Sequence, residues 1–226
     1  MALWRNWPVR EYDLIIFDWD GTLADSIGRI VDAMEHAAVA GGLQPCTASA
    51  IKGIIGLELS EAIGQLHPML DDAALHAFRQ RYAERYMAMD AVPSPLFPGV
   101  AHGLQQFREQ GYKLAVATGK ARRGLDRVLR AHGLATFFDI TRAADETLSK
   151  PAPRMLYEIL EHCGVEPARA VMVGDSAFDI QMAHNAGVAS VAVGYGAIEL
   201  DTLRQYEPTH AIEVFQALEP WLAGRH

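Results

Sequence analysis

The sequence has few of the features that mark extracellular, redox-active or nucleic-acid-binding proteins. It contains only two cysteines, Cys46 and Cys163, which lie far apart and form no CxxC motif. This usage is typical of reduced thiols in a cytosolic protein, and it gives no redox or metal-binding motif. The net charge of −8 argues against a nucleic acid or an anionic membrane as the main partner, although a local cation can still attract an anionic substrate.

Long hydrophobic runs are also missing. The first eight residues contain no apolar core of the length found in signal peptides. The longest segment without a formal charge, Ile180–Ile198, includes two amide side chains, a histidine and three glycines, which argues against a membrane span. We therefore expect a cytoplasmic protein, with Trp4 and Trp7 packed on the surface of the folded domain.

Strand and helix patterns alternate through most of the chain, which has 226 residues and no internal repeat. Short apolar runs typical of buried strands lie at Tyr12–Phe17, Lys113–Thr118, Phe137–Thr141, Ala170–Val173 and Ser190–Val193. Apolar residues with helical spacing lie between them, at Val100–Gln110, Gly124–His132, Pro153–Cys163 and Ala177–Ala186. This alternation predicts an α/β fold with a doubly wound parallel sheet.

Residues 24–92 contain helical patterns and no convincing strand, and the Pro-rich segment 92–99 then leads back to the alternating pattern. The helical segments begin near Ser26 and include Ala48–Lys52, Leu59–Leu66 and Asp71–Met89. The last of these carries a stripe of large side chains that we interpret as core packing, formed by Leu75, Phe78, Tyr82 and Tyr86. The sequence thus predicts an α/β core of residues 1–23 and 93–226, with residues 24–92 inserted as an all-helical unit.

Two carboxylates, Asp18 and Asp20, follow the first predicted strand directly. If the strand continued, side chains two residues apart would share one face, where two like charges repel each other and are costly to desolvate. A bound cation is the simplest way to tolerate such a pair. The alternative is a polar strand end in which Asp20-Gly21 is an ordinary turn signal.

Three further groups of polar residues follow short apolar runs. Thr118-Gly119-Lys120 comes after one predicted strand, Lys150-Pro151 follows the irregular segment Arg142–Ser149, and Gly174–Asp179 comes after another strand. In an open α/β sheet, ligands bind at the carboxyl ends of the strands. We therefore expect these groups and the first pair of carboxylates to meet in one crevice.

With these four motifs in this order, the chain resembles the haloacid dehalogenase-like hydrolase superfamily. The matching residues are Asp18 and Asp20, then Thr118, then Lys150, and finally Asp175 and Asp179. The resemblance covers nearly the whole chain and implies a Rossmann-like core with a helical cap between the first and second motifs. This cap position marks the subclass that contains phosphoglycolate phosphatases, β-phosphoglucomutase, phosphonatase and the 2-haloacid dehalogenases.

The resemblance implies phosphoryl transfer through an aspartyl-phosphate. Asp18 would be the nucleophile, and Asp20 would protonate the leaving group and then activate water as a general base. Dehalogenases of the superfamily lack the second aspartate, so Asp20 favours a phosphatase or a phosphomutase.

The resemblance also implies a magnesium site. Asp175 would hold Mg²⁺ together with Asp18 and the backbone carbonyl of Asp20. Asp179, one helical turn after Asp175, would orient a metal-bound water or Lys150. The alternative for Asp175 and Asp179 is a helix N-cap and an acidic residue in the first turn, which is compatible with metal binding.

The phosphate would be bound by Thr118, the backbone amide of Gly119 and Lys150, whose charge would stabilise the phosphoryl group and the nucleophile. Lys120 is followed by Arg122, Arg123, Arg127 and Arg130. We interpret Lys120 as part of a solvated basic face.

The segment from Lys52 to Leu59 resembles the cap loop of phosphoglycolate phosphatase-like members, so we expect Gly56, Glu58 and Lys52 to influence substrate choice. The sequence predicts a Mg²⁺-dependent phosphomonoesterase that acts on a small, phosphoglycolate-like phosphorylated metabolite, as a monomer or homodimer. Because a basic residue before a cap glycine also occurs in β-phosphoglucomutase-like members, Lys52 keeps a phosphosugar mutase open. A non-catalytic protein that binds a phosphorylated metabolite is the third possibility.

Overall fold

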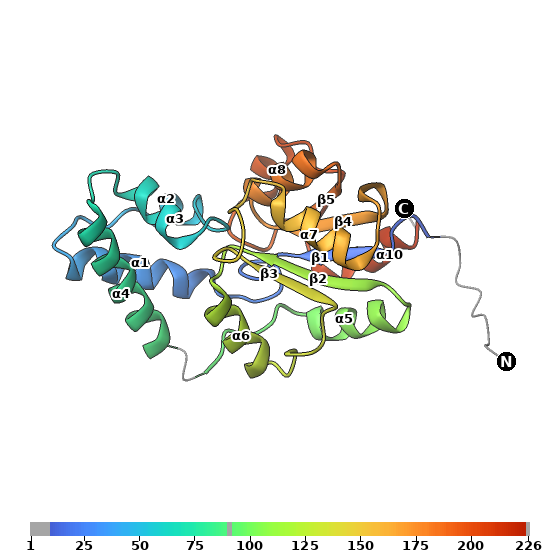
Figure 1. The fold of residues 1–226 in the computed structure, drawn as a ribbon, viewed down its shortest axis with the longest axis horizontal. Helices are drawn as coiled ribbons and strands as arrows, with labels where there is room; N and C mark the ends of the chain where they lie inside the picture. Colours follow the sequence, from blue (N-terminus) through green and yellow to red (C-terminus); the bar gives the residue numbers. More distant parts are fainter. Residues whose placement is uncertain (1–9, 90–91, 225–226) are drawn as a thin grey trace.

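A six-stranded parallel sheet forms the centre of the computed structural model, which describes residues 10–89 and 92–224 (Figure 1). Trp4 and Trp7 therefore lie outside the described residues. The strands are β1 (Leu14–Phe17), β2 (Lys113–Thr118), β3 (Ile140–Ala143), β4 (Ala170–Gly174), β5 (Ala189–Val193) and β6 (His210–Ile212). Their order, β3-β2-β1-β4-β5-β6, is that of a Rossmann-like doubly wound sheet and confirms the predicted fold class.

Helices cover both faces of the sheet, which explains why β1 reads as an unbroken apolar run. Ile15 and Phe17 pack beneath α5 (Val100–Glu109), α6 (Arg122–Ala131) and α10 (Leu218–Leu222). Leu14 and Ile16 point to the other face, under α7 (Arg154–Cys163) and α8 (Ala177–Ala186). A short helix, α9 (Leu200–Arg204), packs beside β5. Across the described ranges, no helix has both the length and the apolar character needed to cross a lipid bilayer.

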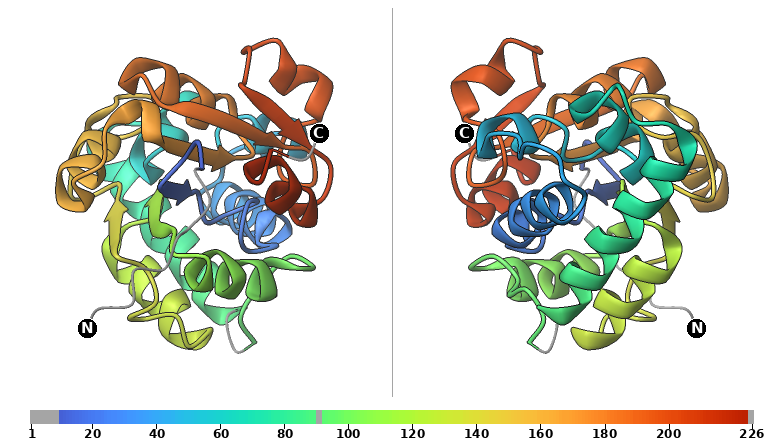
Figure 2. Two further views of the ribbon diagram at one scale, coloured as in Figure 1. Left: turned by 90° about the vertical axis from the view of Figure 1, so that its right-hand side faces the viewer. Right: turned by 90° about the vertical axis from the view of Figure 1, so that its left-hand side faces the viewer.

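Four helices form a separate lobe at the carboxyl edge of the sheet: α1 (Ile27–Ala40), α2 (Ala48–Lys52), α3 (Leu59–Leu66) and α4 (Asp72–Ala88). This helical lobe has its own hydrophobic cluster, and it lies in front of the sheet in the right-hand view of Figure 2. Thr47 caps α2 as its type predicts, because its hydroxyl accepts a hydrogen bond of 3.2 Å from the Ala50 amide. The division into residues 1–23, 24–92 and 93–226 stays a prediction.

Some element boundaries differ from the predicted ones. β3 begins at Ile140, which pairs with Ala115, and it extends to Ala143, beyond the predicted end of the strand. Phe137 and Phe138, which made the predicted strand look apolar, instead form an edge-to-face pair before it and pack against the core. β6 was not predicted from the sequence, because it is only three residues long.

Candidate active site

The carboxyl ends of β1 and β4 lie side by side at the point where the strand order of the sheet reverses. Phe17 pairs with Val173, and the Asp18 amide donates a hydrogen bond of 2.9 Å to the Val173 carbonyl. Asp18 and Asp175 therefore leave adjacent strand ends, and both are buried. This switch point is where open α/β sheets bind their ligands.

Three buried carboxylates gather around a single ammonium at this point. Oxygens of Asp18, Asp175 and Asp179 lie within 4.8 Å of one another. Lys150, whose side chain is fully buried, places Nζ 2.8 Å from Asp18 Oδ1 and 2.7 Å from Asp179 Oδ1. Asp175 instead accepts hydrogen bonds from the Thr22 hydroxyl at 3.0 Å and the Ala197 amide at 2.7 Å. One ammonium cannot balance three carboxylates, and the oxygen-rich set fits a hard divalent cation.

The pKa values of this cluster show the same imbalance. Burial raises the pKa of Asp18 to about 7; the ammonium of Lys150 opposes that rise and Asp179 adds to it. Burial, followed by the charges of Asp18 and Asp179, also raises the pKa of Asp175. Burial alone would lower the pKa of Lys150, but Asp179 and Asp18 outweigh it and hold that pKa above its ordinary value. Without a cation, the cluster thus retains protons close to neutral pH.

Asp20 points away from this cluster, toward the helical lobe. Its carboxylate accepts a hydrogen bond of 2.5 Å from the Ser26 hydroxyl and lies 2.8 Å from Lys120 Nζ. Lys120 also lies 3.4 Å from the Tyr86 hydroxyl on α4. Its side chain is only 12% exposed, so the interpretation of Lys120 as part of a solvated basic face is wrong. The cause is tertiary: α4 packs over the loop that carries Lys120.

Thr118 and Gly119 end β2 beside the carboxylates, as predicted, with Thr118 buried. A Cβ atom on Gly119 would lie 2.5 Å from the Gly56 carbonyl oxygen and 2.6 Å from that of Leu57. Only glycine permits so close an approach of the lobe loop to the core. Gly56 itself has φ +109°, which favours glycine as well.

A cavity of about 430 Å³ lies between the helical lobe and the core, with Asp18, Asp20 and Thr118 on its wall. Gly56 and Glu58 line it, as predicted for cap residues. The Glu58 carboxylate also caps α3, where it accepts hydrogen bonds from the amides of Ser60 at 2.7 Å and Glu61 at 3.2 Å.

Lys52 does not line this cavity. It lies in the last turn of α2, and its role in substrate choice stays a prediction.

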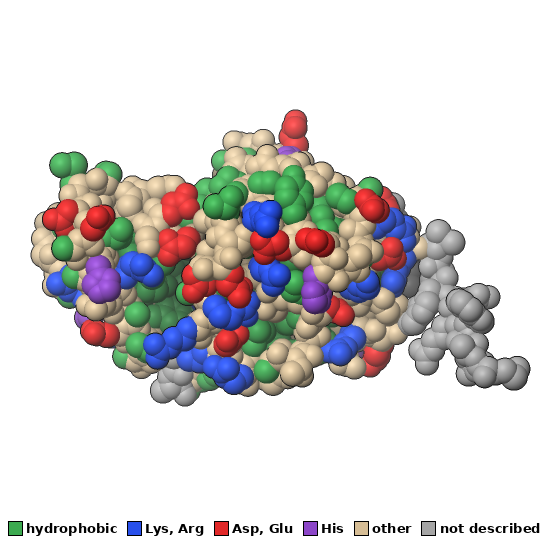
Figure 3. Space-filling view, in the orientation of Figure 1, with side chains coloured by type: hydrophobic (Ala, Val, Ile, Leu, Met, Phe, Trp, Pro, Cys, Tyr) green, Lys and Arg blue, Asp and Glu red, His purple; other side chains and the backbone are tan. Residues whose placement is uncertain are grey.

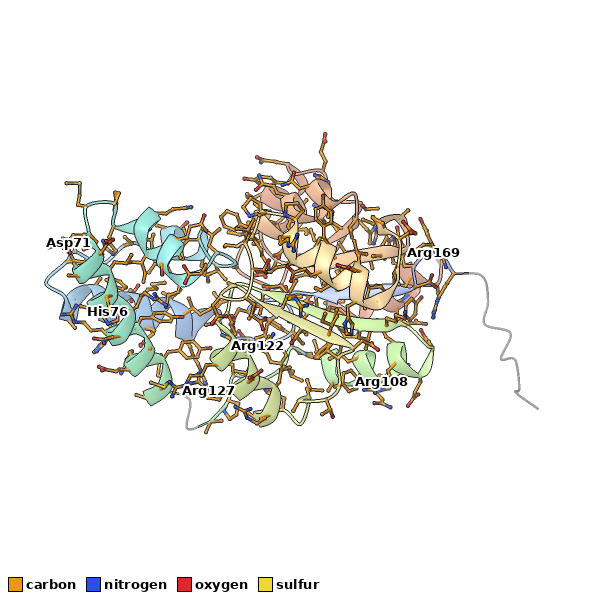
Figure 4. The ribbon with its side chains drawn as sticks, in the orientation of Figure 1. Asp71, His76, Arg108, Arg122, Arg127 and Arg169 are labelled. Atoms are coloured by element: carbon orange, nitrogen blue, oxygen red, sulfur yellow. The ribbon has the colours of Figure 1, made fainter. Side chains whose placement is uncertain are left out.

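Several residues that line the cavity were missed from the sequence. Tyr82 and Tyr86 belong to the stripe interpreted as core packing; they do pack against the lobe's hydrophobic cluster, but they also line the cavity. Arg123 and Arg127 were assigned to a solvated face, yet both line it as well. Their spacing was the available signal, since residues four apart share one helix face and this helix begins directly after Thr118-Gly119-Lys120. Figure 4 shows Arg127 on α6 and His76, another lining residue, on α4.

We expect divalent-cation affinity to fall as the pH drops through about 7, because protons and the cation compete for Asp18 and Asp175. Between the ordinary pKa of 3.8 and about 7, the folded apoprotein binds more protons than the unfolded chain. The apoprotein therefore loses stability as the pH rises through this range. Calorimetric Mg²⁺ titration and urea unfolding on either side of pH 7 measure both effects. Asp201→Asn removes an exposed carboxylate outside the cluster, and as the control it should leave both pH effects unchanged. An Mg²⁺ affinity that does not depend on pH would contradict the expectation.

Gly119→Ala should loosen the contact between the helical lobe and the core. The added methyl group meets the backbone carbonyls of Gly56 and Leu57, which cannot yield as a flexible side chain would. We expect faster amide hydrogen exchange in the loop around Gly56. Gly64→Ala is the matched control, because a Cβ there meets no atom within 4 Å. Equal exchange in both variants would show that the loop does not depend on Gly119.

Known proteins share both this sequence pattern and this fold. The family model described as haloacid dehalogenase-like hydrolase matches residues 15–193. The chain is 37% identical to the probable phosphatase IndB of Dickeya dadantii, covering 89% of this chain and 90% of that protein. It is 31% identical to a phosphoglycolate phosphatase of Psychrobacter arcticus, covering 94% and 96%. The crystal structure of a predicted phosphoglycolate phosphatase from Haemophilus somnus superimposes with a TM-score of 0.81 and 26% identity, covering 95% and 99%. The chain therefore belongs to the haloacid dehalogenase-like hydrolase family, within its phosphoglycolate phosphatase-like group of phosphatases.

Proposed function

We propose that this phosphatase is a Mg²⁺-dependent phosphomonoesterase that transfers the phosphoryl group of a small metabolite to Asp18 and then to water. The observation that carries the proposal is the buried contact of 2.8 Å between Lys150 Nζ and Asp18 Oδ1 at the switch point of the sheet. This contact fixes one oxygen of the nucleophile and leaves the other for phosphorus. Thr118 and the Gly119 amide stand beside it to bind phosphoryl oxygens.

Mg²⁺ would be held by the carboxylates of Asp18 and Asp175 and by the backbone carbonyl of Asp20. The ion supplies charge neutralisation for the phosphoryl oxygens when bound. Asp179 is committed elsewhere: Oδ1 accepts from Lys150 at 2.7 Å, and Oδ2 accepts from the Ser176 hydroxyl at 2.6 Å. We therefore assign Asp179 to positioning Lys150 and capping α8.

Asp20 acts as general acid for the leaving group and as general base for the water that attacks the aspartyl-phosphate. The Ser26 hydroxyl at 2.5 Å and Lys120 Nζ at 2.8 Å hold the Asp20 carboxylate in place. The acid step requires a proton on Asp20.

The relatives named as phosphoglycolate phosphatases support a small, acidic phosphate ester as the starting point for the substrate. We favour the phosphatase over a phosphosugar mutase, because Lys52 is not among the residues that line the cavity. The buried set of Asp18, Asp175 and Lys150 supports catalysis over mere binding of a metabolite. The two cysteines, Cys46 and Cys163, are both free, which supports a cytoplasmic location, and we propose a monomer or homodimer.

Hydrolysis of p-nitrophenyl phosphate with Mg²⁺, with EDTA, and with Ca²⁺ tests the metal dependence. We expect turnover only with Mg²⁺, because Ca²⁺ takes more oxygen ligands at longer distances and would misplace Asp18. Full turnover in metal-free buffer would overturn the metal requirement. If no ester is hydrolysed, the protein would be a non-catalytic binder of a phosphorylated metabolite. If it interconverts sugar-phosphate isomers in the presence of a bisphosphate primer, it would be a mutase.

Asp20→Asn should separate the two half-reactions. Nitrophenolate leaves without much protonation, so Asp18 can still accept the phosphoryl group, but asparagine cannot activate water. We expect a burst of nitrophenolate approaching one equivalent per site, followed by a steady state slower by ~10²–10⁴-fold. Alkyl phosphates should show no burst, because their leaving groups need the proton. Stopped-flow absorbance measures the burst. Wild-type rates of Asp20→Asn on both ester types would show that Asp20 has no part in the mechanism. A burst in Asp18→Asn would show that Asp18 is not the nucleophile.

A further inference from the structure

The cavity above the phosphoryl site is larger than a two-carbon phosphate ester requires. Its volume of about 430 Å³ lies in the range of sites that enclose drug-sized ligands. Asp18 and Thr118 belong to its core side, so a phosphoryl group there fills only one end. The leaving group of the substrate would occupy the rest of the cavity.

The walls around that remaining space are mostly apolar and aromatic. They include Ile30 and Met34 from α1, Leu59 from α3, and Tyr82, Tyr86 and Met87 from α4. Ile30 and Met34 are buried beneath the cavity, and Figure 3 shows a hollow lined with hydrophobic side chains between the helical lobe and the core. A sugar placed against these apolar side chains would bury hydroxyl groups that they cannot pair, which is costly. The walls fit a hydrocarbon or aromatic body, whose burial is favourable.

Arginine side chains also line the cavity, and one of them, Arg127, lies 6.0 Å from the centre of the Tyr86 ring. Arg79 reaches the cavity from α4, and Arg123 and Arg127 reach it from α6. Apart from Asp18 and Asp20, Glu58 is the one acidic residue among the described lining residues, and its carboxylate already caps α3. This local excess of positive charge contrasts with the net charge of −8 for the chain. It is complementary to a second anionic group on the substrate.

Helix α4 gives the distance between the two charged ends. Tyr86 marks the phosphoryl end, because its hydroxyl lies 3.4 Å from Lys120 Nζ. Arg79 lies seven residues earlier on the same helix, which is about 10 Å along its axis. Residues seven apart share one helix face, so Tyr86 and Arg79 line one continuous wall.

We propose that the enzyme selects phosphate monoesters whose leaving group has an apolar or aromatic body that ends in a second acidic group, bound near Arg79. The inference rests on the proposed function, because the phosphoryl site at Asp18 fixes one end of the substrate. The preferred leaving group would be longer and more apolar than the glycolate of phosphoglycolate.

Four phosphate esters of alcohols test this selectivity: 4-carboxybenzyl phosphate, benzyl phosphate, phosphoglycolate and glucose 6-phosphate. We expect kcat/KM for 4-carboxybenzyl phosphate to exceed that for phosphoglycolate and glucose 6-phosphate by at least about tenfold, from burial of the ring. It should exceed that for benzyl phosphate by about threefold, from a partly exposed ion pair.

Arg79→Gln should abolish most of the advantage of 4-carboxybenzyl phosphate over benzyl phosphate. The matched control is Arg130→Gln, because Arg130 lies on α6 but does not line the cavity, and it should preserve the advantage. Comparing two substrates on one variant cancels any difference in the amount of folded protein.

The outcomes separate the two levels of the argument. If phosphoglycolate or glucose 6-phosphate is hydrolysed as efficiently as 4-carboxybenzyl phosphate, the proposed substrate class is overturned while the phosphatase function stands. An unchanged preference in Arg79→Gln would remove Arg79 from acid recognition and overturn the proposal in its stated form. If none of the esters is hydrolysed with Mg²⁺, the proposed function fails as well.

Discussion

The ammonium of Lys150, buried between the carboxylates of Asp18 and Asp179, is the interaction on which the site depends. A fully buried lysine is stable only when it is paired, and this one joins the end of β1 to the first turn of α8. The same contact orients the proposed nucleophile. It also leaves Asp175 without a cation of its own among the described residues, and this excess of negative charge is the physical reason for a divalent metal at the site.

The helical lobe contributes a second layer of control. The loop around Gly56 packs against Gly119 so closely that no side chain fits between them. Tyr86, on α4, lies 3.4 Å from Lys120, which is the ion-pair partner of Asp20. The groups that bind the phosphoryl end come from strand ends of the core, and most of those facing the leaving group come from the lobe. In the proposed mechanism, chemistry and selectivity are thus carried by different elements, which meet at the cavity between the lobe and the core.

The sequence was sufficient for the parallel α/β fold and for much of the buried cluster, because polar residues that directly follow buried strands must meet at one edge of a parallel sheet. Asp18 and Asp175 could be placed by that rule alone, whereas Lys150 follows an irregular segment and was placed by its resemblance to a family motif. Lys120 could not, since its burial depends on α4, an element that lies far away in the sequence. Tyr82 and Tyr86 show a related limit: helical spacing predicts a buried face, but it does not say whether that face meets other side chains or a ligand.

Chemical trapping of the intermediate tests the central claim most directly. The enzyme would be mixed with excess p-nitrophenyl phosphate and Mg²⁺, quenched during turnover, and treated with borohydride, which reduces an acyl phosphate to an alcohol. The account predicts that mass spectrometry of the peptides finds homoserine at position 18, in place of Asp18, and only after substrate has been added. Homoserine at another position, or an unmodified Asp18 in protein that is turning over, would contradict it.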